Sequence, residues 1–415
     1  MRNRCVGVVF YVSALFLLLS SGAMAKEWKL SPKQSIAEVV EQAQAGDTLR
    51  FVAGVYKQAN IIIQKPLVLL GEKGAVLDGS HQHEILVLAA EHITVQGLSF
   101  QHSGRSSLND LAAIKCLDAH YVRIINNQFD NTFFGIHLSN SNYALIEGNT
   151  LKAQALNEYE LGNGIHLWKC KNARIVKNTI TGHRDGIYFE FVTHSTIQEN
   201  ISTKNMRYGL HFMFSNDDEY LNNTFKNNGA GVSVMYSHGV SMHGNRFEEN
   251  WGESSYGLLL KDIRDSEVID NQFLANTSGI YMEGCSRTQF HGNEFKNNGW
   301  AIQLQASCND NTLERNNFQG NSFDVVTNGV VVLNTLKNNY WDKYQGYDLD
   351  KDGLGDVPFR PVNMFSTVME RVPAAIVLWR SMLVFLLDRA EKVIPAMTPE
   401  NLMDNQPRMK PYDYN

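Results

Sequence analysis

Apolar and polar residues alternate in short segments along most of this chain. The clearest segments follow a glycine and read apolar, any residue, apolar, as in Ile136 and Leu138 after Gly135. A period of two is typical of a β-strand that buries one face. The chain is therefore expected to consist of many short strands. The same pattern follows six further glycines: Gly164, Gly186, Gly209, Gly231, Gly257 and Gly279.

These segments belong to a repeat that is marked by Asn-x-apolar triplets. The spacings between successive triplets are 22, 29, 22, 23, 22, 26, 22, 23 and 22 residues. A unit of this length cannot bury its apolar side alone and must stack on copies of itself. We therefore predict an all-β fold, a right-handed parallel β-helix over residues 51–345 with roughly a dozen coils. The asparagines expected to align from coil to coil are Asn127, Asn149, Asn178, Asn200, Asn223, Asn245, Asn271, Asn293, Asn316 and Asn338.

Three insertions interrupt this repeat, within residues 98–113, 149–164 and 245–257. All three fall in the same section of the coil, so they should emerge from one edge of the solenoid. Loops grouped on one face of a repeat protein usually form its binding face, although surface insertions are also tolerated without a role. We expect a binding surface along this edge.

The N-terminal end of the solenoid needs a cover, because an open β-helix end is an unpaired sheet edge. Residues 26–50 contain Ser35-Ile-Ala-Glu38, a capping box that predicts an amphipathic helix from Ile36 to Ala45. We expect residues 26–50 to form the N-terminal cap.

The repeat stops near the C-terminus, where three segments follow it. Residues 346–360 form an Asp/Gly loop cap, residues 361–397 an apolar helical extension, and residues 398–415 a polar tail that is expected to be flexible. An apolar helix outside a finished core needs something to cover it. It either folds back on the solenoid or docks on a membrane partner, and docking is our prediction. The expected contact residues are Trp379, Leu383, Phe385 and Leu386.

Residues 1–25 have the features of a signal peptide. Two arginines precede an apolar run over residues 6–19, and Ala23-Met24-Ala25 provides a cleavage site. An uncleaved membrane anchor is the alternative, but the apolar run is short for a bilayer. We therefore expect an exported protein.

Composition and charge exclude several classes of protein. The chain is 43% hydrophobic and 19% charged, which excludes a disordered, collagen-like or multi-span membrane protein. Its formal net charge is -6, so it has no basic field that would hold a polyanion. Nucleic acid is not expected as a partner.

Histidine and methionine recur at two positions that should face outward from the strand after each glycine. His137, His166 and His211 lie two residues past the glycine, and Met213 and Met235 lie four residues past it. Residues one coil apart should stack near 5 Å from each other. Imidazole and thioether are ligands that suit copper, and thioether favours Cu(I). These five residues are our candidate for a transient copper site, and packing against a partner is the alternative role.

Four cysteines would remain after export, which is too few for a disulfide scaffold. Cys116 replaces an inward leucine of its coil and is expected in the core. Cys285 and Cys308 lie 23 residues apart, about one coil, so a disulfide and a reduced stack are the two main alternatives, and a metal thiolate site is the third.

The Asp/Gly loop resembles the first part of a calcium-binding loop, with candidate ligands Asp348, Asp350, Asp352 and Asp356. Phe359 stands where an EF-hand has its bidentate glutamate, so a complete EF-hand is absent. A weak calcium site and a simple turn that caps the solenoid remain the two interpretations.

Several motifs together resemble the NosD family of periplasmic accessory proteins of nitrous-oxide reductase maturation. They are Ser35-Ile-x-Glu38, Gly46-Asp47-Thr48-Leu49, Gly54-x-Tyr56, the Asn/Gly coils, and Asn339-Tyr340-Trp341-Asp342 before the Asp/Gly loop. The resemblance covers nearly the whole chain after residue 25. The coil motifs are shared with other β-helix proteins, and the ending is what narrows the choice to this family.

The resemblance implies a role without enzymatic activity. Proteins of this family work with an ABC transporter of permease and ATPase subunits in the inner membrane and with a copper chaperone. They assist assembly of the copper–sulfur cluster of nitrous-oxide reductase. Here the apolar extension would hold the protein at the inner membrane through the permease.

The alternative function is that of a secreted β-helix polysaccharide lyase, epimerase or hydrolase. Such enzymes need paired carboxylates, or a base near arginine or calcium, along the groove. His183-Arg184-Asp185 and Asp217-Asp218-Glu219 are candidate groups. The two outward columns, however, have only Glu190 and Glu283, which lie roughly 20 Å apart by coil rise. The sequence therefore favours an accessory protein over an enzyme, and a passive adhesion solenoid is a third possibility.

Overall fold

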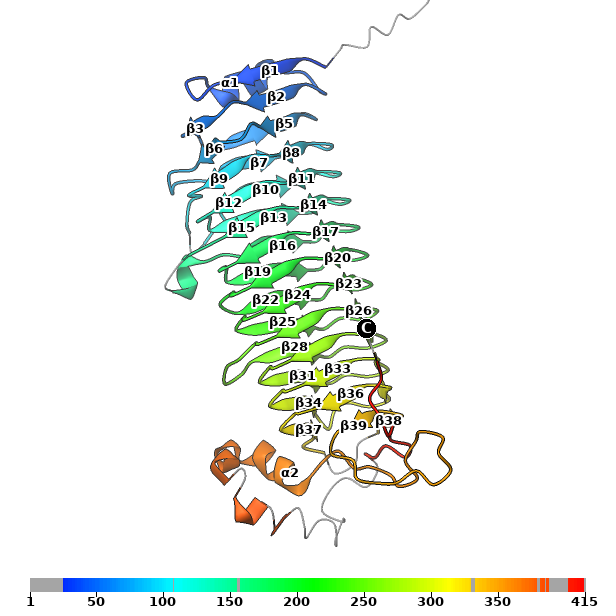
Figure 1. The fold of residues 1–415 in the computed structure, drawn as a ribbon. Coiled ribbons are helices and arrows are strands. Elements are labelled where there is room, and N and C mark those ends of the chain that lie inside the picture. Colours follow the sequence, from blue (N-terminus) through cyan, green and yellow to red (C-terminus); the bar gives the residue numbers. More distant parts are fainter. Residues whose placement is uncertain are drawn as a thin grey trace, which may run out of the picture.

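The computed structural model describes residues 25–106, 108–154, 157–329, 333–378, 381–384, 386–387 and 402–413. Their strands stack into a solenoid of three parallel sheets with 14, 12 and 13 strands (Figure 1). The predicted parallel β-helix is therefore confirmed. The predicted signal peptide lies outside the described residues apart from Ala25.

One sheet, here named the β1–β38 sheet, opens each coil. Its strands are mostly three residues long and bury the central one, so Ile124, Ile146 and Ile175 form one apolar column in register. The strands are β1 Glu27–Leu30, β2 Thr48–Phe51, β5 Val68–Gly71, β8 Thr94–Gln96, β11 Arg123–Ile125, β14 Leu145–Glu147, β17 Arg174–Val176, β20 Thr196–Gln198, β23 Glu219–Leu221, β26 Ser241–His243, β29 Glu267–Ile269, β32 Gln289–His291, β35 Thr312–Glu314 and β38 Thr335–Lys337.

The chain then enters the β3–β39 sheet, which supplies the aromatic part of the core. Phe273, Phe295 and Phe318 stack with centroids 4.8 Å apart, and Trp341 follows at 4.1 Å. Such pairs add about 0.5–1.5 kcal/mol each to the burial of their area. The strands are β3 Gly54–Tyr56, β6 Ala75–Asp78, β9 Ser99–Gln101, β12 Gln128–Asp130, β15 Thr150–Lys152, β18 Thr179–Thr181, β21 Ile201–Thr203, β24 Thr224–Lys226, β27 Arg246–Glu248, β30 Gln272–Leu274, β33 Glu294–Lys296, β36 Asn317–Gln319 and β39 Tyr340–Trp341.

The β4–β37 sheet closes each coil and has the longest strands. It contains the apolar residues that follow the repeated glycines, and Ile136 and Leu138 pair in register with Ile165 and Leu167 in the next coil. The strands are β4 Ile61–Ile63, β7 Leu86–Leu88, β10 Ala112–Leu117, β13 Phe134–Ser139, β16 Ile165–Trp168, β19 Asp185–Glu190, β22 Tyr208–Met213, β25 Ala230–Met235, β28 Tyr256–Lys261, β31 Ser278–Glu283, β34 Trp300–Leu304 and β37 Phe323–Val326.

A column of buried asparagines fixes the coils in register at the turn between the first two sheets. Asn127 donates from its backbone N–H to Asn149 Oδ1 at 2.9 Å and from Nδ2 to Val95 O at 2.9 Å. The same bonds recur down the solenoid, so each asparagine ties together neighbouring coils. The last member is Asn339 rather than the predicted Asn338. Asn338 occupies the preceding position, where the chain has a positive φ of 55°.

A second asparagine column, which the sequence analysis did not identify, lies five residues further along each coil. Asn205 donates from its backbone N–H to Asn228 Oδ1 at 3.0 Å, and each member repeats this bond to the next. The column begins one coil earlier, at the backbone N–H of His183. Its members are Asn205, Asn228, Asn250, Asn276, Asn298 and Asn321.

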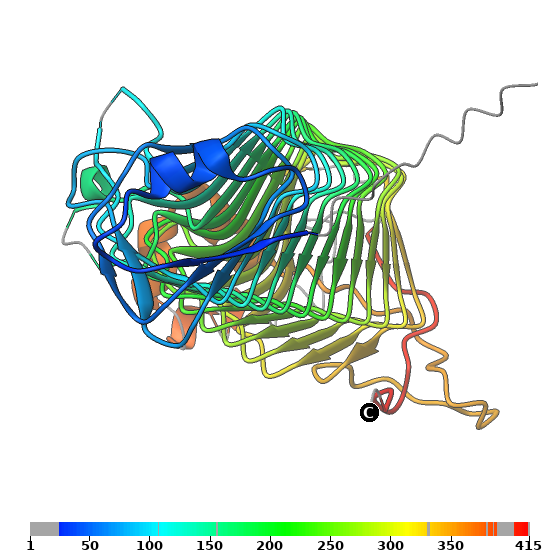
Figure 2. The ribbon, with the colours of Figure 1, turned by 90° about the horizontal axis from the view of Figure 1, so that it is seen from above.

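At the N-terminal end, helix α1 (Ile36–Gln42) lies over the first coil (Figure 2). Ser35 Oγ accepts the backbone N–H of Glu38, which is one of the two bonds of a capping box. The helix ends at Gln42, three residues before the predicted Ala45. Lys65 Nζ donates to the carbonyl oxygens of residues 40, 41 and 43 and so satisfies the C-terminal end of the helix.

The prediction of a flexible C-terminal tail is wrong for residues 402–413. Leu402 and Asp404 are fully buried, and residues Asp404 and Arg408 bridge in parallel to Leu336 and Tyr340 of the last coil. Asp404 takes the place of the next ladder asparagine, because its Oδ2 accepts the backbone N–H and Nδ2 of Asn339. The segment is ordered because it satisfies polar groups that the final coil would otherwise leave buried and unpaired.

The helical extension also differs from a single apolar helix. It contains helix α2 (Met364–Arg371), and the 3₁₀ helix η2 (Pro373–Leu378) begins at the proline that cannot continue α2. Phe365, Met369 and Val384 pack against Phe323 of the last coil. Part of the extension therefore folds back on the solenoid. Among the described residues, no helix has the length and apolar character needed to cross a bilayer.

We predict that Asp404→Ala will loosen the C-terminal end. The substitution removes the acceptor for five donors, namely the backbone N–H groups of Asn338, Asn339 and Gln406, Asn339 Nδ2 and Trp341 Nε1. Leaving such groups unpaired should lower the free energy of local opening of residues 402–413 by at least about 2 kcal/mol. Hydrogen exchange of this segment measures the effect. Asp404→Asn keeps one acceptor oxygen and should lose less, and equal exchange in all three proteins would contradict the assignment.

Candidate functional site

The outer face of the β4–β37 sheet has a continuous row of rings. His137, His166, Tyr188 and His211 are in register across four consecutive strands. Their successive ring centroids are 4.6, 4.6 and 5.0 Å apart. We call these four residues the ring column. The predicted stacking of His137 on His166 is present, and Tyr188 connects both to His211.

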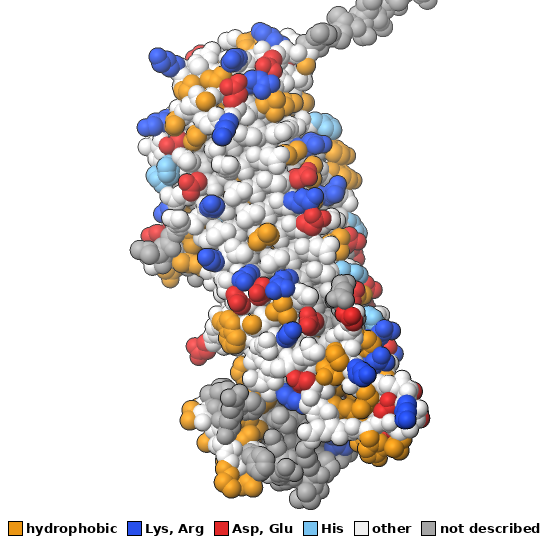
Figure 3. Space-filling model, in the orientation of Figure 1, with side chains coloured by type: hydrophobic (Ala, Val, Ile, Leu, Met, Phe, Trp, Pro, Cys, Tyr) orange, Lys and Arg blue, Asp and Glu red, His pale blue; other side chains and the backbone are white. Residues whose placement is uncertain are grey.

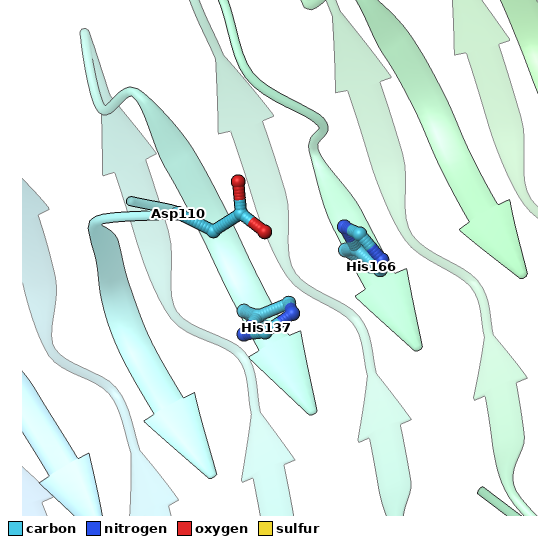
Figure 4. A group of neighbouring side chains, drawn as sticks. All are labelled: Asp110, His137 and His166. Carbon is cyan, nitrogen blue, oxygen red and sulfur yellow. The ribbon is translucent and has the colours of Figure 1, made fainter. Parts of the chain in front are cut away.

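The histidines of the ring column are covered, although they point away from the core. His137, His166 and His211 are only 8%, 9% and 6% exposed. The cover includes Phe134, whose ring centroid lies 5.7 Å from that of His166. Asp110 belongs to the first insertion and approaches the two upper histidines (Figure 4). The residues predicted to face outward are therefore sheltered, in part by the first insertion.

Burial sets the protonation of the upper histidines. It lowers the pKa of His137 to about 4, against a smaller opposing effect of Asp110. It also holds the pKa of His166 well below its ordinary value, and His137 adds to this effect. Both imidazoles are therefore neutral near pH 7, which is the form that binds a metal ion. Burial likewise raises the pKa of Tyr188 to about 12, so the phenol keeps its proton.

The predicted methionine pair lies beside the lower part of the ring column. Met213 and Met235 are in register on adjacent strands, and Tyr188 donates its O–H to Met213 Sδ at 3.8 Å. The five predicted copper ligands therefore share one face, but not one cluster. His137 and His166 lie at one end, and Met213 and Met235 lie two and three coils further on from His166.

A third outward column, at the residue before each glycine, was missed by the sequence analysis. Asp185 Oδ2 lies 3.7 Å from His211 Nδ1, and Asp185 Oδ1 lies 3.7 Å from Arg207 Nε. The side chain before the glycine thus reaches the outer face as well. The repeated glycine itself was the available signal, because a Cβ at Gly209 would lie 2.7 Å from Gly231 O. Such a close approach of two backbones indicates a bend in the strand. At a bend, the strict alternation of inward and outward side chains fails.

Most of the groups proposed for an alternative enzyme lie away from the outer face of the β4–β37 sheet. His183 is fully buried under the turn, and Asp218 is buried where its Oδ1 accepts the backbone N–H of Ser195. Burial raises the pKa of Asp218 to about 9. The two predicted columns have only Glu190 and Glu283 as carboxylates, but they do not account for every carboxylate on the outer face. Asp110 and Asp185 reach it from positions outside the two predicted columns.

The four cysteines after residue 25 are buried free thiols in the structure. Cys116 lies in the core as predicted. Cys285 donates its backbone N–H to Cys308 Sγ at 3.4 Å, so these residues form the reduced stack. They occupy turn positions where other coils have Ser215 and Ser237, which make the equivalent contact.

In the Asp/Gly loop, ligand atoms of Asp348, Asp350 and Asp352 lie within 4.8 Å of one another. Each of these carboxylates also accepts a backbone N–H within the loop. Asp356 accepts the backbone N–H of Leu349 instead. The loop is thus a hydrogen-bonded turn, whose carboxylates are also close enough together to hold a cation.

These features define a class of protein, a parallel β-helix with a sheltered row of imidazoles and thioethers on one sheet. A family model described as "Periplasmic copper-binding protein (NosD)" matches residues 152–346. A protein of Stutzerimonas stutzeri, "Probable ABC transporter binding protein NosD", is 26% identical over 420 residues, which cover 96% of this chain and 93% of that protein. A protein of the same name from Pseudomonas aeruginosa is 28% identical over 374 residues, which cover 86% of this chain and 87% of that protein. These matches confirm the predicted resemblance to NosD.

Solved structures support the fold. The periplasmic alginate epimerase AlgG superposes with a TM-score of 0.51 at 12% identity, over 76% of this chain and 75% of that one. The catalytic domain of a GH87 α-1,3-glucanase also superposes with a TM-score of 0.51. Its sequence is 11% identical, and the match covers 76% of this chain and 69% of that one. At these identities the likeness concerns the fold alone.

Proposed function

We propose that this chain is a periplasmic accessory protein without catalytic activity that assists assembly of the copper–sulfur cluster of nitrous-oxide reductase. It would work with an ABC transporter in the inner membrane and a copper chaperone. The family described as periplasmic and copper-binding, and the relatives named as ABC transporter binding proteins, support this role. The observation that carries the proposal is the single outer face that presents the ring column beside Met213 and Met235.

The chemistry of this face suits transient copper. Thioether sulfur is a soft ligand that favours Cu(I), and imidazole binds copper in either oxidation state. His211 lies in the same strand as Met213, and Met235 follows in the next strand. Copper would be cargo here rather than a resident cofactor. The partial cover by the inserted loops would exclude water and slow oxidation of the bound ion.

The alternative, an enzyme acting on a polysaccharide, has one observation in its favour. Asp185 approaches both His211 and Arg207, a grouping that could serve acid–base chemistry. The side chain of Asp185 is, however, only 1% exposed, and the His211 side chain is 7% exposed. A single ion can reach such groups when a loop moves, but a polymer chain cannot lie along them. We therefore favour the accessory role.

The helical extension is suited to the proposed docking on the permease. One of its faces packs on the last coil, whereas Val377, Met382, Leu383 and Leu386 are 86%, 77%, 51% and 51% exposed. Apolar side chains gather at this end of the molecule (Figure 3). Trp379 and Phe385, which were predicted to join them, lie outside the described residues.

A weak calcium site in the Asp/Gly loop would stiffen the neighbouring C-terminal cap.

The copper hypothesis predicts that Met213→Leu combined with Met235→Leu will weaken Cu(I) binding. Leucine keeps the volume but removes both soft ligands. An anaerobic Cu(I) titration against a competing chelator should show at least about a tenfold loss of affinity. Met206→Leu, an exposed methionine outside the face, is the matched control. Equal Cu(I) affinity in the double variant and the wild type would reject the assignment.

If the helical extension docks on the permease, Leu383→Glu combined with Leu386→Glu will release the protein from its transporter. Two charges on the exposed apolar surface should abolish co-purification with the permease and ATPase from cells that express all three. Val55→Glu combined with Ile62→Glu places the same charges on exposed residues of the first coils and should have no effect. Point substitutions are preferable to deletion, which would also remove Asp404. Unchanged retention of the first variant would argue against docking through the extension.

A further inference from the structure

Asp110, His137 and His166 form a cluster that has the geometry of a metal site. One ligand atom from each residue lies within 4.8 Å of the other two. His137 and His166 come from adjacent strands β13 and β16, and Asp110 comes from the loop just before β10 (Figure 4). Three consecutive coils therefore converge on one point. The two histidines are buried and Asp110 is exposed, so an ion would enter from the Asp110 side.

A buried polar atom without a partner also points to a ligand. The exposed fraction of His137 is only 8%, and its Nδ1 makes no hydrogen bond to the part of the chain that the structure describes. Leaving such an atom unpaired costs about 1–3 kcal/mol. His166 is better supported, because Asn163 Nδ2 lies 3.4 Å from its Nδ1 and orients the ring. Binding a cation would compensate the cost at His137.

The lysine beside His137 is already paired with another residue. Lys115 is in register with His137 on the neighbouring strand. Its Nζ pairs with Glu84 Oε1 at 3.0 Å, so its charge is already compensated. The carboxylate of Asp110 is therefore available to balance the charge of a bound ion.

We propose that Asp110, His137 and His166 bind a divalent transition-metal ion of the zinc type. Two imidazoles and one carboxylate make the three-ligand set that leaves a fourth position open for water. The set lacks the soft sulfur that Cu(I) prefers and has too few oxygens for Ca²⁺. This site is distinct from Met213 and Met235, and it stands whether or not the chain handles copper. Because Asp110 lies in the first insertion, the ion would fasten that loop over the ring column.

The binding test uses the full chain after residue 25, in excess Ca²⁺ so that the Asp/Gly loop does not contribute. Calorimetric titration with Zn²⁺ should give one site, and Co²⁺ should give the visible absorption of a low-symmetry four-coordinate ion. Asp110→Asn and His137→Asn should each weaken Zn²⁺ at least about tenfold. The matched controls are Asp130→Asn, an exposed aspartate of the neighbouring sheet, and His102→Gln, a histidine that already pairs with Asp78. Zn²⁺ affinity that is unchanged by the first two variants, or lost with His102→Gln instead, would overturn the proposal.

A second measurement reports on the loop rather than on affinity. Arg105 lies in the first insertion, five residues before Asp110, and provides a trypsin cleavage site. Zn²⁺ should slow cleavage after Arg105 in the wild type and leave the rate in Asp110→Asn unchanged. A rate that Zn²⁺ does not alter in the wild type would show that the loop is not fastened by the ion and would also count against the site.

Discussion

The buried asparagine column that begins at Asn127 fixes the relation between every coil and the next. Each side chain after Asn127 accepts from the backbone and side chain of the previous member and donates to a carbonyl of a neighbouring strand. A slip of one residue would leave several of these groups buried and unpaired, at a cost of about 1–3 kcal/mol for each. The column therefore holds the strands of all three sheets in register. Asp404 ends it with a carboxylate, which can only accept and so requires no further coil.

Register in turn creates the face that has the candidate ligands. Because each strand of the β4–β37 sheet begins at the same point of its coil, residues that are 22 or more positions apart in sequence become direct neighbours. Along this face the available ligands change from carboxylate and imidazole near Asp110 to thioether near Met235. Tyr188 lies between the two ends and donates its O–H to Met213. A solenoid is well suited to such an arrangement, since each coil adds one position to the row.

The repeat made the coil register and part of the site predictable. The spacing of the asparagines and glycines was sufficient to place His137 next to His166, and it placed Cys116 in the core. The position of Asp110 depends on how an insertion folds back, and the insertion has no period from which this could be inferred. The column that includes Asp185 was missed because the chain bends at each glycine and interrupts the simple alternation. The role of Asp404 was hidden because it lies 65 positions after Asn339, beyond a stretch without any repeat.

The central claim is that this protein holds copper through its own side chains rather than serving only as a platform for its partners. X-ray absorption at the copper edge, on the full chain loaded anaerobically with one equivalent of Cu(I), tests that claim most directly. The structure predicts a first coordination shell that contains thioether sulfur and imidazole nitrogen. A shell without sulfur, or copper that is removed by desalting before the measurement, would contradict the account and assign the copper chemistry to the partners.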